Sequence, residues 1–342
     1  KLSSVTQEKI TTKLQSSATS GMPSTILLDK ITARRQTKAM ARVMQQILGP
    51  KRRPFCIMDI DPSSPNRGNL GARLAAINGY LNFSSTAHYF IDAIGKDAPL
   101  EFLADNFIEH LKSLDNGPPI VVFGFTFVLY HTVFQILKER GIVINLPTGS
   151  QVIHIGGWKK LEEKKVDKEI FNAQISSVFG INSEDVIDIY GFTEQMGLNY
   201  PDCKAGWKHL PVYSEVLIRN EADLSICPDG TLGLLEFISP LQHSYPGNVV
   251  LTDDLGVSRT GKCECGYVGR RFKVLGRAQK AEVRGCGDIM SEKVASVIRQ
   301  VGDVDVKTKL DILHAPKDID PIQPPSEQLP SIIEMLKLKQ LW

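Results

Sequence analysis

The sequence predicts an α/β fold with a mostly parallel sheet flanked by helices, followed by a small β subdomain and a short C-terminal segment. Up to about residue 200, short apolar runs rich in β-branched residues alternate with amphipathic helical patterns, as in a parallel sheet. From there to about residue 280, turn signals follow one another closely, as between antiparallel strands. We therefore expect an α/β core at 1–200, a β subdomain at 201–280 and a short segment at 281–342.

The predicted elements follow from local patterns taken in chain order. Helical patterns cover residues 1–15, 27–48, 70–80, 99–114, 128–140 and 161–180. Strand patterns begin at residues 55, 119, 151 and 185 in the core and at 212, 229, 249 and 272 in the subdomain. The strands of the core alternate with helices, and this alternation predicts that they pair in parallel.

The composition is that of a globular protein and argues against several classes of function. Apolar residues make up 42% and charged residues 23% of the 342-residue chain, whose formal net charge is +2. This charge is too small to favour nucleic acid or an anionic membrane. No apolar run reaches the length of a transmembrane helix. No signal peptide follows Lys1, so we expect a cytoplasmic protein.

The stretch 188–197, which reads DIYGFTEQMG, is where we expect a ligand to bind. The strand before it breaks at Gly191, and Thr193, Glu194 and Gln195 follow at once. In an open α/β sheet, ligands lie just beyond the carboxyl ends of strands. A hydroxyl and a carboxylate there can hold a phosphate oxygen and a Mg²⁺ ion, since this cation takes oxygen ligands. The alternative is a polar turn followed by a helix cap.

Three further stretches offer contacts to a nucleotide. Residues 16–24 are dense in hydroxyl groups and can wrap a phosphate, although no Walker sequence closes them, and the alternative is a flexible loop. The pair Gly156-Gly157 lets a planar ring approach the backbone, with Lys159 close by in sequence, and the alternative is a tight turn. One carboxylate of the strand end at 253–254 can bind a ribose diol.

Cys203, His209, Cys263 and Cys265 form a candidate metal site in the predicted β subdomain. Three thiolates and one imidazole make a closed tetrahedral set, the usual choice for structural zinc. The two halves are far apart in sequence and match no standard zinc-finger spacing. The alternative is therefore a set of reduced cysteines that never meet. A zinc ion here would stabilise the subdomain and leave no open coordination position for catalysis.

Taken in order, these stretches resemble motifs of the adenylate-forming superfamily of acyl and aryl acid ligases. The segment YGFTE at 190–194 matches the motif Tyr-Gly-x-Thr-Glu, and TDDLG at 252–256 is similar to the ribose motif Thr-Gly-Asp-Leu. Residues 16–24 resemble the phosphate loop, 156–157 the adenine-side glycine pair and 275–277 the Gly-Arg hinge motif.

Within the superfamily, the chain looks most like the acyl-protein synthetases, the long-chain-fatty-acid ligases of the bacterial luciferase fatty-acid reductase system. This likeness rests on HIGGWKK at 154–160 and YGFTEQ at 190–195. The turn KCECG at 262–266 is also similar to phenylacetate–CoA ligases, several of which carry a Cys/His zinc site. The resemblance therefore strengthens the prediction of Zn²⁺.

The resemblance implies an enzyme, an AMP-forming acid–thiol ligase. ATP would activate a carboxylic acid, preferably a fatty acid, to an acyl-adenylate, and a thiol would then take the acyl group. Catalysis would fall to Thr193, Glu194 and Lys159, with Glu194 holding Mg²⁺. The implied nucleotide contacts are Ser16, Ser17, Thr19, Ser20, Gly21, Gly156, Gly157, Tyr190, Gly191, Phe192, Thr193, Asp254 and Arg277.

The thiol acceptor stays open between a cysteine of this chain, a carrier protein, a reductase partner and CoA. Two other functions also stay open: an aryl-acid–CoA ligase on the same fold, and a nucleotide-binding scaffold without activity. The scaffold enters because the superfamily's catalytic C-terminal domain is not recognisable after Gly287. In addition, Asp253 stands where the ribose motif has glycine, and Gln279 and Lys280 stand where many relatives have acidic residues.

Overall fold

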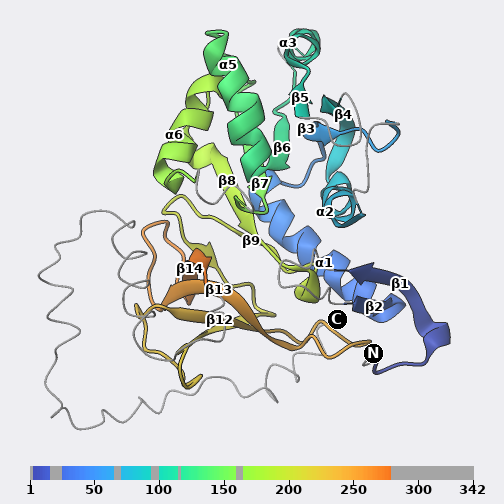
Figure 1. Ribbon diagram of the computed structural model, residues 1–342, viewed down its shortest axis with the longest axis vertical. Helices are drawn as coiled ribbons and strands as arrows, with labels where there is room; N and C mark the ends of the chain where they lie inside the picture. Colours follow the sequence, from blue (N-terminus) through green and yellow to red (C-terminus); the bar gives the residue numbers. More distant parts are fainter. Residues whose placement is uncertain are drawn as a thin grey trace, which may run out of the picture. The chain divides into compact units, whose positions relative to one another are not determined.

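The computed structural model describes residues 3–15, 25–64, 71–93, 100–114, 117–158 and 165–278. Residues Lys1–Arg277 form one compact unit. Within it, a seven-stranded sheet with helices lies beside a five-stranded sheet, and a two-stranded hairpin lies near the N-terminus (Figure 1). None of the described helices combines the length and the apolar character that crossing a membrane requires.

The seven-stranded sheet has the order β5-β4-β3-β6-β7-β8-β9. Its strands are β3 (Arg53–Ile60), β4 (Ser84–Ala93), β5 (Leu100–Phe102), β6 (Val121–Phe125), β7 (Gln151–Ile155), β8 (Val186–Tyr190) and β9 (Tyr200–Pro201). Strands β4, β3, β6, β7 and β8 pair in parallel, and the two edge strands β5 and β9 pair antiparallel. The predicted, mostly parallel sheet is therefore confirmed, although β4 had no predicted counterpart.

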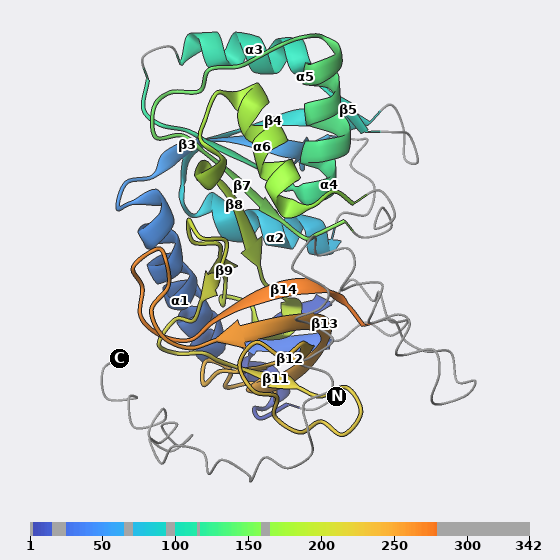
Figure 2. The same ribbon diagram turned by 90° about the vertical axis from the view of Figure 1, so that its left-hand side faces the viewer.

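Helices cover both faces of this sheet (Figures 1 and 2). They are α1 (Lys30–Leu48), α2 (Gly71–Leu81), α3 (Ala104–Ser113), α4 (Thr126–Val128), a π-helical segment (Leu129–Phe134), α5 (Gln135–Glu139) and α6 (Lys168–Phe179). Tyr80 of α2 packs on Phe123 of β6, with ring centroids 4.6 Å apart. On the other face, Phe171 of α6 packs on His154 of β7 at 4.6 Å. The buried aromatic rings between these layers form the core.

The five-stranded sheet is antiparallel throughout, with the order β10-β14-β13-β12-β11. Its strands are β10 (Lys208–His209), β11 (Glu215–Arg219), β12 (Gly233–Ile238), β13 (Val249–Arg259) and β14 (Arg271–Arg277). One face packs through Phe237 and Phe272 against Tyr200 of β9 and Ala39 of α1. The second sheet therefore lies against the edge of the first, close to the end of β8. The expected boundaries near residues 200 and 280 stay a prediction.

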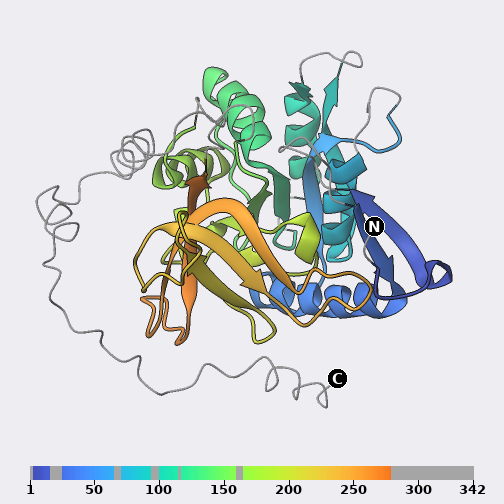
Figure 3. The same cartoon turned by 60° about the horizontal axis from the view of Figure 1, so that its bottom comes forward.

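The helix predicted over residues 1–15 is wrong. A short 3-10 turn (Gln7–Lys9) leads into β1 (Ile10–Gln15), which pairs antiparallel with β2 (Thr25–Asp29). Strand β1 is mostly exposed, so it lacks the buried stripe that identifies a strand in a sequence, and its partner β2 follows only after the segment 16–24. Figure 3 shows the hairpin beside α1. The helix expected from residue 27 begins at Lys30, because Asp29 caps it by accepting a hydrogen bond from the Thr32 amide.

Candidate active site

The turn after β8 is fixed from two sides. A side chain at Gly197, whose φ is +88°, would collide with the Gln36 backbone of α1, so only glycine fits there. The fully buried Gln195 amide donates to the carbonyls of Gly247 (2.9 Å) and Phe237 (3.2 Å). The Tyr245 hydroxyl donates to the Glu194 carbonyl at 2.7 Å. The backbone of the 3-10 turn Thr193–Gln195 is therefore held by the second sheet and its loops.

The side chains of Thr193 and Glu194 are left unengaged by this arrangement. Both are half-buried, and neither the hydroxyl nor the carboxylate has a hydrogen-bond or ion-pair partner within the part of the chain that the structure describes. A rigid backbone with two unengaged oxygen-bearing side chains is suited to a ligand that brings its own charge.

Tyr190, the last residue of β8, links the two sheets. Its hydroxyl donates to Asp254 Oδ2 at 2.7 Å, and Arg277 Nε lies 3.3 Å from Asp254 Oδ1. Asp254 and Arg277 face each other across the β13–β14 pair. The structure thus brings together three predicted site residues that are far apart in sequence.

The protonation states of this group follow from burial. Burial, together with the neighbouring Asp254, raises the pKa of Tyr190, so its hydroxyl stays protonated and donates. Burial also raises the pKa of the Asp254 carboxyl, against the opposing effects of the Tyr190 hydroxyl and Arg277. The charged form of Asp254 is therefore not fully compensated by its protein neighbours.

Two residues earlier in β8, Asp188 belongs to a partly buried group of charges around the buried Lys208. Its Oδ2 lies 3.0 Å from Nζ of Lys208 and 3.6 Å from Nζ of Lys168. Asp202 contacts both lysines, and its Oδ1 lies 3.1 Å from Lys208 Nζ. Nδ1 of His154 lies 3.9 Å from Asp188 Oδ1. We call Asp188, Lys208, Asp202, Lys168 and His154 the Asp188 network; the sequence patterns did not reveal it.

The charges of the Asp188 network are mutually compensated. Burial alone would raise the pKa of Asp188, but Lys208, His154 and Lys168 outweigh it and hold the pKa well below its usual range. Burial alone would lower the pKa of Lys208, but Asp188 and Asp202 raise it. Burial lowers the pKa of His154 to about 4, so this imidazole is neutral.

The glycine pair after β7 lies next to this network. Gly156 and Gly157 have φ values of +84° and +58°. A Cβ at Gly157 would meet no atom within 4 Å, so the backbone is open on that side. Trp158 turns inward instead and packs on Tyr130, with centroids 5.3 Å apart. A planar ring of a ligand can therefore approach the Gly157 backbone. The indole of Trp158 faces inward and is not available to stack on such a ring.

Several expected site residues lie outside the described residues. They are Ser16, Ser17, Thr19, Ser20, Gly21 and Lys159; Gln279 and Lys280, the two departures from the superfamily pattern, also lie outside them. The segment 16–24 connects β1 to β2.

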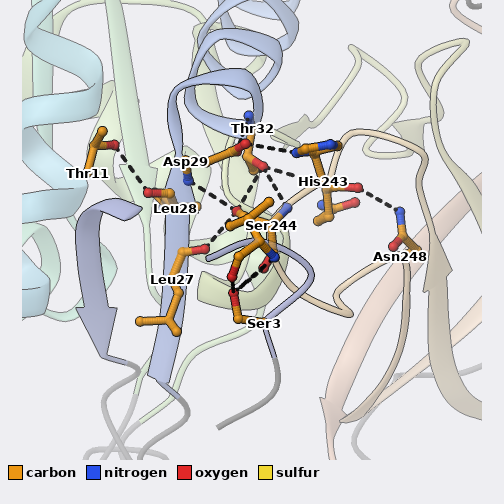
Figure 4. A network of polar contacts seen from close by, with 11 residues as sticks. Ser3, Thr11, Leu27, Leu28, Asp29, Thr32, His243, Ser244 and Asn248 are labelled. Atoms are coloured by element: carbon orange, nitrogen blue, oxygen red, sulfur yellow. Dashed lines mark hydrogen bonds and ion pairs between the residues drawn. The ribbon is translucent and has the colours of Figure 1, made fainter. Parts of the chain in front are cut away.

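A polar cluster anchors that hairpin (Figure 4). Asp29 Oδ2 lies 2.8 Å from His243 Nδ1, and the Ser244 hydroxyl donates to the Leu27 carbonyl at 2.7 Å. The Thr32 hydroxyl accepts from the amides of His243 and Ser244, both at 3.1 Å. The loop that carries His243 and Ser244 continues to Tyr245, which contacts Glu194. The hairpin and the turn after β8 are therefore tied to the same loop.

The four predicted metal-ligand residues come together. Ligand atoms of Cys203, His209, Cys263 and Cys265 all lie within 4.8 Å of one another. Cys203 Sγ is 3.9 Å from Cys263 Sγ, and His209 Nε2 is 3.2 Å from Cys265 Sγ. Two thiolates bound tetrahedrally to one zinc ion would be roughly 3.8 Å apart. The alternative in which the cysteines never meet is therefore wrong, and we call these four residues the Cys/His cluster.

Two turns of the same shape build the Cys/His cluster. The amide of Cys203 donates to the Trp207 carbonyl, and that of Cys263 donates to the Tyr267 carbonyl, at 2.7 and 2.8 Å. Each turn has a glycine three residues after its first cysteine, with φ values of +69° and +93°. The sequence spacing hid this likeness, because the second turn carries two cysteines and the first carries one.

Comparisons with known proteins agree with the motifs. A family model described as acyl-protein synthetase, LuxE, matches residues 1–295. A long-chain-fatty-acid–luciferin-component ligase of Aliivibrio fischeri is 24% identical over 311 residues, which cover 87% of this chain and 77% of that protein. The ligase of the same name from Vibrio harveyi is 21% identical over 285 residues, covering 83% and 72%.

A solved structure has a similar fold. It is that of a 2-hydroxyisobutyryl-CoA ligase in complex with 2-HIB-AMP and CoA, with a TM-score of 0.53 and 17% identity. The match covers 80% of this chain, and this chain spans 58% of the ligase. At this level of identity the likeness establishes the fold alone.

Proposed function

This chain belongs to the acyl-protein synthetase family LuxE, and from this premise we propose that it activates a long-chain fatty acid with ATP and transfers the acyl group to a thiol. In the first step, a carboxylate oxygen attacks the α-phosphorus of ATP, and pyrophosphate leaves with the bonding electrons. In the second step, a thiolate attacks the acyl carbonyl carbon, and AMP leaves. The thiol proton passes to solvent.

The contact of Tyr190 with Asp254, and of Asp254 with Arg277, carries the proposal. Through these contacts the segments 190–194, 252–256 and 275–277 meet near the carboxyl end of β8, and the ends of such strands are where open α/β sheets bind ligands. Hydroxyl groups of a ribose would donate to Asp254 and so compensate the charge that burial disfavours. Tyr190 would orient the carboxylate.

Thr193 and Glu194 would act on the phosphates. The Thr193 hydroxyl would donate to a phosphate oxygen at the α-phosphorus. A single carboxylate suits Mg²⁺, which commonly binds one or two carboxylates together with substrate phosphates. When bound, Mg²⁺ neutralises charge on the phosphates. Glu194 would hold it, and Lys159 with Ser16, Ser17, Thr19, Ser20 and Gly21 would complete the phosphate contacts.

The names of the two bacterial relatives support a long-chain fatty acid as substrate. The acceptor thiol would belong to a cysteine of this chain, to a carrier or reductase partner, or to CoA, which the similar solved ligase binds. We place the reaction in the cytoplasm.

We further propose that the Cys/His cluster holds structural zinc. Three sulfur donors and one imidazole nitrogen at these separations match a closed tetrahedral site. Elemental analysis of the purified protein is expected to give about one zinc per chain, and Cys265→Ser is expected to lower it. Stable protein without bound metal would remove the proposal.

The activity test is ATP–pyrophosphate exchange with a panel of fatty and aromatic acids. Exchange is expected with long-chain fatty acids, and Glu194→Gln is expected to lower it about 100- to 1000-fold, as when a group that stabilises transition-state charge is lost. Glu184→Gln, at an exposed carboxylate that pairs with Lys204, is the matched control and should leave exchange unchanged. Exchange with aromatic acids only would point to the aryl-acid–CoA ligase. ATP binding without exchange would point to the scaffold.

A further inference from the structure

The segment that carries two residues of the Cys/His cluster also carries a buried lysine. Lys208 is 2% exposed and directly precedes His209. Its Nζ contacts Asp188 Oδ2 (3.0 Å), Asp202 Oδ1 (3.1 Å) and the backbone carbonyls of Asp188 (2.9 Å) and Tyr200 (3.2 Å). An ammonium has three donors, so none is left over for solvent or a ligand. All donors of the Lys208 ammonium group therefore bond to neighbouring groups of the protein.

These neighbours lie at the junction of two sites. Asp202 directly precedes Cys203, as Lys208 precedes His209. Both members of the Asp202–Lys208 ion pair are therefore sequence neighbours of residues of the Cys/His cluster. Asp188 stands two residues before Tyr190, at the entry to the 190–194 motif. Its carbonyl accepts from both the Asp202 amide at 3.0 Å and Lys208 Nζ. The turn of the Cys/His cluster and the end of β8 are thus joined by both backbone and side chain.

The Asp188 network also reaches the ends of the two preceding strands. His154 of β7 stands opposite Asp188 in the strand pairing. Its Nδ1 is 2.9 Å from the hydroxyl of Thr126, the residue that follows β6. The carboxyl ends of β6, β7 and β8 therefore rest on one connected set of polar groups.

A buried ion pair is weak evidence for stability, because apolar residues of similar size often do as well in its place. What such a pair can supply is a fixed geometry. Lys208 spans the few ångströms between a metal-binding turn and a nucleotide motif, where a small displacement of the motif strongly affects catalysis.

We propose that Lys208 is a positioning residue, which transmits the filling of the Cys/His cluster to the nucleotide motif at 190–194. Metal at the cluster fixes the turn that holds Asp202 and Lys208. Lys208 in turn fixes the Asp188 carbonyl and carboxylate, and so the direction in which β8 delivers Tyr190, Thr193 and Glu194. This inference rests on the proposed function, and it gives the metal a role in nucleotide binding beyond local stability.

The test is a cycle of Lys208→Met, Cys265→Ser and the double variant in the full chain. ATP affinity is measured by calorimetry, and amide hydrogen exchange is followed in the peptide 189–197. Each single change is expected to weaken ATP binding about tenfold and to speed exchange in that peptide, a typical size for linked sites. The double variant should be hardly weaker than either single one, because both break the same link. Effects that multiply would overturn the proposal.

Two controls separate positioning from loss of structure. Lys204 lies on the same turn, its side chain is 72% exposed, and it pairs with Glu184. Lys204→Met should therefore change neither ATP affinity nor hydrogen exchange in the peptide 189–197. Asp202→Asn keeps an acceptor for Lys208 and nearly the same shape, so it tests the link even if Lys208→Met does not fold. It should weaken ATP binding by about threefold while exchange in the β3 peptide 53–60 stays slow. Unchanged ATP affinity in a folded Asp202→Asn protein would count against the link.

The two proposals can fail separately. Absence of ATP–pyrophosphate exchange in the unchanged protein would remove the proposed function. The cycle would still decide the role of Lys208, because it is measured by ATP binding and by hydrogen exchange.

Discussion

Asp188 and Asp254, the two carboxylates near Tyr190, show opposite ways of placing a charge in a protein. Their side chains are similarly exposed, 26% for Asp188 and 21% for Asp254. Asp188 lies within 3.6 Å of two lysine ammonium groups, and its pKa is lowered. Asp254 has a neutral hydroxyl and one half-exposed guanidinium, and its pKa is raised. The exposed fractions of the two side chains therefore do not account for their opposite pKa shifts, whereas their interaction partners do.

The difference indicates what each carboxylate is for. Asp188 is satisfied by the protein itself, so it holds structure and has nothing to offer a ligand. Asp254 is left incompletely compensated, which is typical of a site where a ligand supplies the missing hydrogen bonds. A network whose charges compensate one another thus supports a site in which one carboxylate awaits compensation by a ligand.

The largest effect is expected from Asp188→Asn. Removing this charge leaves the nearly inaccessible Lys208 with Asp202 as its remaining carboxylate, and breaking a buried pair from one side costs about 3 kcal/mol of unfolding free energy. Asp105→Asn is the matched control, since Asp105 forms an exposed ion pair with Arg140 and should cost less than about 1 kcal/mol. Urea unfolding measures both. Equal losses in the two variants would break the distinction drawn between the Asp188 network and an ordinary surface pair.

A smaller effect is expected at Asp29, a third carboxylate, which has one partly exposed imidazole beside it. Burial alone would raise the pKa of Asp29, but the hydroxyl and amide of Thr32 and the imidazole of His243 lower it to about 2. A lowered pKa stabilises the fold above about pH 4 and loses that contribution as the pH falls towards 2. The wild type should exceed Asp29→Asn by about 2 kcal/mol at pH 5 and by about 1 kcal/mol at pH 3.

The measurement for Asp29 is urea unfolding of both proteins at the two pH values. Taking the difference between the proteins cancels the acid sensitivity of other groups, including the Cys/His cluster. A difference that does not change with pH would mean that the charge of Asp29 contributes little, and Asp29 would then resemble Asp254 more than Asp188.

The parts of the fold that the sequence predicted are those specified by local pattern. Buried runs such as residues 55–58 are apolar on both faces, as in a central parallel strand, and the helix from residue 128 shows a clear stripe. Strand β4 was missed because its residues, SSTAHYFIDA, mix polar and apolar types without a regular period. Strand β1 was mistaken for a helix because its partner β2 is separated from it by residues 16–24 and its faces are mostly exposed.

The candidate site likewise contains residues that a local pattern predicted and residues that it did not. Tyr190, Thr193, Glu194 and Asp254 were predicted because their motifs are contiguous. Lys208 gave no signal, since a lysine between a tryptophan and a histidine usually faces solvent, and its partner Asp188 is twenty residues away. Whether a charged residue is buried depends on which strand end it meets in the folded chain, and a local pattern does not contain that information.

The smallest effect on stability, and the most specific one, is expected from Asp254→Asn. Because burial disfavours the charged carboxylate, removing the charge offsets the loss of the Arg277 contact, and the unfolding free energy should change by less than about 1 kcal/mol. ATP affinity should nevertheless fall about tenfold, since an amide accepts the ribose hydroxyls without charge assistance. Calorimetry with ATP and urea unfolding measure the two quantities. The opposite result would be a loss of stability as large as that of Asp188→Asn with unchanged ATP affinity. Asp254 would then be a structural carboxylate, and the two residues would not differ as a supporting and a ligand-binding group.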